Sequence, residues 1–90
     1  MSRNVFKPAQ GGSLDIGFKA DGDERITVRV FNLAGEMVRP VAEMDVKSGV
    51  LYGLKWDGRN ESGEMVASGV YVVSVKGANT RIVRKVVVLK

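Results

Sequence analysis

Side chains with metal-ligating oxygens gather between residues 57 and 64, and calcium binding is the chemistry that they suggest. They are Asp57, Asn60, Glu61 and Glu64. An EF-hand loop requires oxygen ligands at positions one, three and five and a glycine at position six. Counted from Asp57, position three is Arg59 and position six is Ser62, so the pattern is not met. Acids, amides and glycines are also the usual residues of turns, and the sequence therefore favours turns without a bound metal or cofactor.

Catalytic chemistry lacks its most common residues in this chain. The sequence has no histidine and no cysteine, which excludes a Ser-His-Asp arrangement, a catalytic thiolate and a disulfide. A Ser-Lys pair stays open, although the serines lie in turn or strand contexts that account for them. Asp21 and Asp23 are paired carboxylates at a predicted hairpin tip, where charge is ordinarily solvated. We therefore predict that the chain is not an enzyme and has no small-molecule substrate.

Basic residues outnumber acidic ones and give a formal net charge of +4. Several of them lie on or around the last predicted hairpin, namely Lys76, Arg81, Arg84 and Lys85. They are candidates for a face that binds an anionic glycan, nucleic acid or membrane headgroups. Charges that keep a strand edge from pairing with other chains are the alternative, and we favour it. Nucleic-acid binding would need stacking aromatics, whereas Tyr52, Trp56 and Tyr71 are expected in the interior.

Period-two alternation of apolar and polar residues dominates the chain and predicts strands. Seven or so short strands follow, at residues 14–19, 26–31, 37–38, 42–46, 50–56, 70–75 and 82–89. Pro40 interrupts one of them, which places that piece at a sheet edge or a crossover. The apolar parity of the last strand is ambiguous across Arg84 and Lys85, which suggests a bulge there. Together these features predict an all-β fold, an antiparallel Ig/fibronectin-III-like β-sandwich.

Phe31 is a candidate contact residue because its parity is opposite to that of the predicted core positions on the same strand. Those positions are Ile26, Val28 and Val30. With Leu33 just beyond it, Phe31 would form a small exposed docking patch. The alternative is that a neighbouring loop covers the Phe31 ring.

Turn signals follow the strand that ends at Trp56. We expect Trp56 in the core, with its indole N–H donating to a backbone carbonyl. Asp57-Gly58 ends that strand, and Asn60 and Gly63 can adopt positive φ within the loop. Glu64 to Val66 is expected to form a very short strand, and Gly69 to begin the central strand.

The segment WDGRNESGEMVASGVYVV, residues 56–73, resembles the signature of the FlgD-type Ig-like domain family. This family includes the Ig-like domain of the flagellar hook-capping protein and similar carboxy-terminal modules of exported bacterial proteins, among them type IX secretion sorting domains. Weaker similarity extends to residues 4–8, 28–38 and 85–90, although Val5 and Lys7 depart from the family pattern. The matching positions, to which we assign structural roles, are Trp56, Asp57, Gly58, Gly63, Gly69 and Tyr71.

The resemblance implies a non-catalytic β-sandwich module at the carboxy-terminus of a longer exported or cell-surface bacterial protein. Its role would be structural, sorting or interaction, with the parent polypeptide, secretion machinery or neighbouring subunits as partners. One alternative is a structural subunit of an extracellular assembly such as a flagellar hook cap. The second is a module that binds anionic glycans or nucleic acid.

Residues 1–90 are expected to form a single domain, with residues 1–12 as a partly extended lead-in. The opening MSRNVFKP is too polar for a signal peptide. The sequence also has no apolar run long enough for a transmembrane helix.

Overall fold

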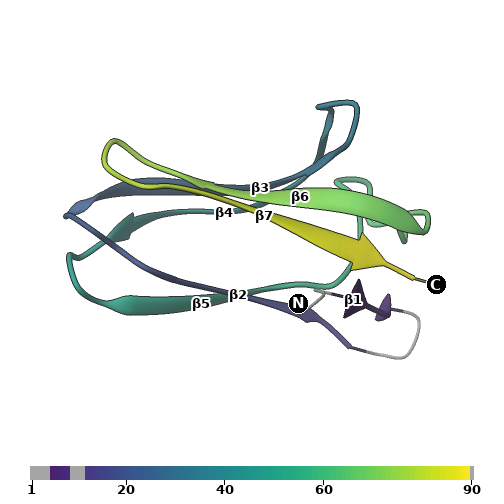
Figure 1. The fold of residues 1–90 in the computed structure, drawn as a ribbon, viewed down its shortest axis with the longest axis horizontal. Helices are drawn as coiled ribbons and strands as arrows, with labels where there is room; N and C mark the ends of the chain where they lie inside the picture. Colours follow the sequence, from purple (N-terminus) through teal and green to yellow (C-terminus); the bar gives the residue numbers. More distant parts are fainter. Residues whose placement is uncertain (1–4, 9–11, 90) are drawn as a thin grey trace.

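The computed structural model describes residues 5–8 and 12–89 and shows two sheets packed face to face (Figure 1). The strands are β1 (Val5–Phe6), β2 (Leu14–Lys19), β3 (Glu24–Asn32), β4 (Met37–Val46), β5 (Leu51–Trp56), β6 (Gly69–Lys76) and β7 (Arg81–Val88). The larger sheet has the order β1-β7-β6-β3-β4, and the smaller one pairs β2 with β5. Every pairing is antiparallel except that of β1 with β7. The predicted antiparallel Ig-like sandwich is thus confirmed.

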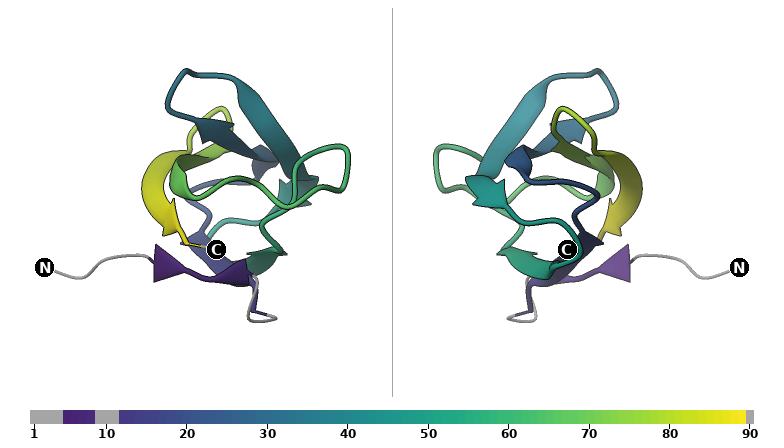
Figure 2. Two further views of the ribbon diagram at one scale, coloured as in Figure 1. Left: turned by 90° about the vertical axis from the view of Figure 1, so that its right-hand side faces the viewer. Right: turned by 90° about the vertical axis from the view of Figure 1, so that its left-hand side faces the viewer.

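The core lies between the two sheets because alternate residues of each strand point inward. On β3 the side chains of Ile26, Val28 and Val30 are fully buried, as their alternation predicts. Ile16 and Phe18 of β2, in the smaller sheet, are also buried and belong to the same core. End-on views show the two layers enclosing this interior (Figure 2). Among the described residues, no helix has the length and apolar character needed to cross a membrane.

Strand β4 lies at the edge of the larger sheet, where Pro40 was expected. The sequence predicted two separate pieces here, but β4 runs without a break from Met37 to Val46. Val28 pairs with Ala42 and Arg29 with Pro40, which leaves Val41 as an extra residue in a bulge. An edge position and a neighbouring bulge are the settings in which a strand accommodates a proline.

The bulge predicted at Arg84 and Lys85 is wrong. Strand β7 pairs with β6 in unbroken register, from Lys76 opposite Arg81 to Gly69 opposite Val88. The parity of Arg84 is therefore the inward one, shared with the buried Val86. Arg84 is nevertheless exposed, because β1 pairs only with the far end of β7 and leaves the edge beside Arg84 uncovered.

Part of the predicted amino-terminal lead-in belongs to the sandwich. Val5–Phe6 forms β1 beside β7, and the backbone N–H of Leu89 donates to the Phe6 carbonyl at 2.9 Å. Phe6 is 5% exposed and belongs to the core. Residues 1–4, 9–11 and 90 lie outside the described part of the chain, and with them the first residue of the 4–8 similarity and the last of the 85–90 similarity.

Candidate functional site

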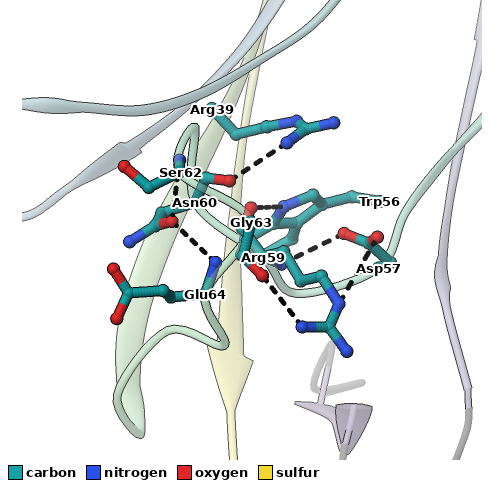
Figure 3. A network of polar contacts seen from close by, with 8 residues as sticks. All are labelled: Arg39, Trp56, Asp57, Arg59, Asn60, Ser62, Gly63 and Glu64. Atoms are coloured by element: carbon teal, nitrogen blue, oxygen red, sulfur yellow. Dashed lines mark hydrogen bonds and ion pairs between the residues drawn. The ribbon is translucent and has the colours of Figure 1, made fainter.

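The segment that follows β5 is built around Trp56. The indole is 2% exposed and lies between the rings of Phe6 and Tyr71, with centroid distances of 5.9 and 5.8 Å. Its Nε1–H donates to the backbone carbonyl of Arg59 at 3.0 Å (Figure 3). This hydrogen bond confirms the predicted interior tryptophan and satisfies a donor that would be costly to bury alone.

Asp57 uses its carboxylate inside its own turn. Oδ1 accepts the backbone N–H of Arg59 at 3.1 Å, and Oδ2 lies 3.9 Å from Nε of Arg59 (Figure 3). The Arg59 guanidinium also donates to the Gly63 carbonyl at 2.9 Å. Gly58 is buried and has a φ of 79°, a conformation that glycine adopts without steric cost. The Asp57-Gly58 pair therefore reverses the chain directly after β5, which ends at Trp56.

Asn60 closes the next turn with its side chain. Its Oδ1 accepts the backbone N–H groups of Ser62 and Glu64, both at 3.0 Å (Figure 3). Both Asn60 and Gly63 could have adopted positive φ, but only Gly63 does so, with a φ of 83°, since no described non-glycine residue has a positive φ. The amide of Asn60 stabilises the turn while its backbone stays in an ordinary conformation.

The very short strand expected at residues 64–66 is not present as such. Only an isolated bridge forms there, between Arg59 and Met65, because the turn leaves room for one pair. The backbone N–H of Val66 instead donates to the Gly58 carbonyl at 2.9 Å, and the Val66 side chain is buried. The loop thereby closes onto the core at both of its ends.

A repeated heptapeptide is the sequence signal that the alternation analysis missed. Asn-x-x-Gly-Glu-Met-Val occurs at residues 32–38 and again at residues 60–66. The first copy repeats the hydrogen bonds of the second, since Asn32 Oδ1 accepts the N–H groups of Ala34 and Glu36, both at 3.0 Å. The five residues that the two copies share therefore build the same turn twice.

The first turn leads into β4, and the second turn hydrogen-bonds to the start of that strand. The backbone N–H of Glu61 donates to the Val38 carbonyl at 2.9 Å, and the Arg39 guanidinium donates to the Asn60 carbonyl at 3.0 Å. An open hollow of about 470 Å³ lies between them and is lined by residues of both turns, including the acids Glu36, Glu61 and Glu64. No three histidine, cysteine or acidic side chains of the described residues come close enough to hold an ion.

Tyr71 and Gly69 complete the segment. Gly69 is the first residue of β6, as predicted. The Tyr71 ring is buried, and its hydroxyl donates to the Ala67 carbonyl at 2.8 Å. This bond fixes the chain just before β6 begins, so that the end of the loop is tied to the core as its beginning is.

The predicted basic residues do not share one face. Lys76, Arg81 and Lys85 lie on the outer face of the larger sheet, whereas Arg84 has the opposite parity. Arg29 of β3 joins the first three, since it pairs with Ser74 on the same outer face. The sequence analysis missed Arg29, although its parity, opposite to that of Val28 and Val30, was a usable signal.

The predicted docking residues are placed differently from each other. Phe31 is half-buried on the outer face and lines a hollow there, whereas Leu33 is 68% exposed on the turn after β3 and does not line it. A shared docking patch of Phe31 and Leu33 stays a prediction. At the other end of the outer face, the Arg25 guanidinium donates hydrogen bonds to the carboxylates of Glu43 at 2.8 Å and Asp45 at 3.2 Å. The hydrogen bond to Glu43, followed by the one to Asp45, raises the pKa of Arg25.

Residues 3–81 match the family model of the FlgD Ig-like domain. The chain belongs to the FlgD Ig-like domain family. The match covers the seven-residue repeat, the tryptophan strand and most of both sheets. The segment from Trp56 to Tyr71 is therefore a family segment whose side chains, in this member, hydrogen-bond and pack within the domain.

Solved structures show the same fold in larger proteins. PorZ, described as an essential bacterial surface component of the type IX secretion system of Porphyromonas gingivalis, superposes with a TM-score of 0.65 at 21% identity over 97% of this chain. FlgD from P. aeruginosa superposes with a TM-score of 0.64 at 14% identity over 91% of this chain. The chain spans 11% of the PorZ chain and 61% of the FlgD chain. No curated protein matches the sequence significantly.

Asn60→Ala in this FlgD-type domain is expected to lower the free energy of unfolding by about 1–2 kcal/mol, because two backbone N–H groups lose their acceptor. Urea unfolding followed by the fluorescence of Trp56 measures the loss. Asn79→Ala is the matched control, since no described residue hydrogen-bonds to the Asn79 side chain. An equal loss in the two variants would show that the Asn60 side chain does not stabilise the turn.

Proposed function

We propose that this domain is a non-catalytic interaction module of a longer exported or cell-surface bacterial protein, with a structural or sorting role at its carboxy-terminus. The observation that carries the proposal is the internal use of the family segment. Trp56, Asp57 and Tyr71 all hydrogen-bond to backbone groups of the domain itself. A segment committed in this way builds a rigid scaffold, so that function belongs to the surfaces that the scaffold presents.

The small share of PorZ that the chain covers supports a role as one module within a longer protein. The carboxy-terminal placement rests on the resemblance of residues 56–73 to modules found at the ends of exported proteins. The partners that fit this role are the parent polypeptide, the secretion machinery or a neighbouring subunit. Residues 1–90 would then fold as a single unit.

A fusion experiment tests the sorting role. A fluorescent reporter with its own signal peptide is joined to the amino-terminal side of residues 1–90 and expressed in a bacterium that has a type IX secretion system. We expect the fusion to reach the cell surface, where added protease removes the reporter, whereas the reporter alone stays in the periplasm. The same fusion in a strain without that system is the control. A folded fusion that stays inside the cell would contradict the sorting role.

A structural subunit of an extracellular assembly is the second candidate, and the similarity to FlgD favours it. The exposed Leu51, at one end of β5, gives such a subunit an apolar contact outside the core. This candidate predicts that the fusion does not reach the surface through the type IX route. The fusion experiment therefore separates the two candidates.

A further inference from the structure

The outer face of the larger sheet carries four cations without a partner. Arg29, Lys76, Arg81 and Lys85, here called the cationic face, are all exposed, and none forms an ion pair with a described residue. The strand pairings bring them together, since Arg29 lies beside Ser74, Lys76 beside Arg81, and Lys85 beside Val72. The acids on this face, Glu43 and Asp45, are already bound to Arg25. A ligand with several negative charges would therefore find the four cations unengaged.

The cationic face is concave where three of its members meet. A hollow of about 270 Å³ is lined by Arg29, Lys76 and Arg81. The other lining residues are two hydroxyl-bearing and two apolar ones, Thr27, Ser74, Phe31 and Val83. Arginine binds carboxylates through two parallel hydrogen bonds, and the hydroxyls add further donors. The hollow thus offers several donors for carboxylate groups at one place.

Apolar as well as hydroxyl-bearing residues lie between the cations, which bears on the kind of partner. Val83 is 57% exposed on this face and is therefore accessible to a partner. Val72 and Phe31 are half-buried on the same face. A protein segment that alternates acidic and apolar side chains matches this mixture, because carboxylates pair with the cations while aliphatic groups cover the valines.

Nucleic acid matches the same face less well. Single-stranded nucleic acid binds on exposed aromatic platforms. Trp56 and Tyr71 are buried, and Tyr52 stacks on Phe18 with a centroid distance of 5.6 Å. Only the half-buried Phe31 ring lies on the cationic face. A hydroxyl-rich polysaccharide would in turn leave Val83 against polar groups.

We infer that the cationic face is a docking surface for an acidic segment of a partner protein. This inference rests on the proposed role of the domain as an interaction module and names the surface and the chemistry of the partner. It holds for a partner in a secretion machinery and for a neighbouring subunit alike. The binding is expected to weaken steeply with added salt, because exposed charges are screened.

Fluorescence anisotropy with a labelled peptide of alternating glutamate and valine tests the inference on residues 1–90. We expect saturable binding at low salt and a loss of affinity of about tenfold in Arg81→Glu, since one cation of the hollow becomes an anion. Lys19→Glu is the matched control, because it changes the net charge equally but lies on β2 in the other sheet. Lys76→Glu is a second test on the same face, and unfolding midpoints confirm that each variant is folded.

Three results would overturn the inference. The peptide does not bind even at low salt, or Lys19→Glu weakens binding as much as Arg81→Glu and Lys76→Glu do. The third is that dextran sulfate or a single-stranded DNA oligonucleotide binds more tightly than the peptide with the same dependence on Arg81, which would assign the face to another class of ligand. The assay uses purified protein, so that failure of the secretion experiment leaves its outcome unaffected.

Discussion

Trp56→Ala is expected to lower the free energy of unfolding by about 3–5 kcal/mol, because truncating a buried tryptophan leaves a cavity in the core. The indole is 2% exposed, contacts two aromatic rings and donates to the Arg59 carbonyl. A small domain has about 5–15 kcal/mol in total, so that this loss removes a large fraction of its stability. Far-UV circular dichroism during urea unfolding measures the loss, since the variant lacks the only tryptophan.

Two variants separate the contributions of Trp56. Trp56→Phe keeps an aromatic ring but removes the donor, and its loss should be smaller than that of alanine. Leu33→Ala truncates a residue that is 68% exposed, and surface truncations of this kind stay within about 0.5 kcal/mol. A Trp56→Ala variant as stable as Leu33→Ala would show that the indole is not part of the core.

Gly58→Ala is expected to cost about 2–4 kcal/mol, from backbone strain and overpacking together. Its φ is 79°, and an added Cβ would lie 2.7 Å from Cβ of Pro8 and 3.1 Å from Cε2 of Phe6. Because Phe6 belongs to β1 and Pro8 follows that strand, the substitution should also loosen the pairing of β1 with β7. Urea unfolding followed by Trp56 fluorescence measures the change.

Gly63→Ala is the matched control for the Gly58 variant. Gly63 has nearly the same φ, 83°, but no atom lies within 4 Å of an added Cβ. Only backbone strain remains, and the expected cost is about 1 kcal/mol. Equal losses at the two positions would mean that Pro8 and Phe6 do not pack on Gly58.

A core strand such as β3 was predictable from the sequence because its inward-facing apolar side chains are all buried. Ile26, Val28 and Val30 alternate with polar residues and are all fully buried. Strand β7 was harder to predict, since Arg84 has inward parity and interrupts the alternation of apolar residues. Its environment depends on how little of β7 is covered by β1, which is a property of the assembled sandwich.

The interior position of Trp56 and its bond to a carbonyl were predictable from the sequence, but the identity of that carbonyl, Arg59, was not. The close approach of Pro8 to Gly58 was not predictable either, because the contacting residue comes from the other end of the chain. The repeated turns at residues 32–38 and 60–66 were accessible to a search for internal repeats. The backbone hydrogen bond from Glu61 to Val38, which joins the two copies, was not predictable from the sequence.

The residues that stabilise the domain and the proposed docking surface lie in different parts of the sandwich. The residues that identify the family fix one end of the sandwich, where Trp56 and Tyr71 are buried. The cationic face lies on the outside of the larger sheet and contains no residue of the family segment itself. Substitutions at Arg81 and at Trp56 should therefore have separable effects, the first on binding and the second on stability.

Hydrogen exchange of the single tryptophan indole tests most directly whether the family segment is part of the folded core. Two-dimensional ¹H–¹⁵N spectra give this N–H one resonance, because Trp56 is the only tryptophan. We expect it to exchange as slowly as the backbone amides of β3 and β6, through global unfolding alone. An indole that exchanges at the rate of exposed tryptophan while those amides stay protected would contradict the account.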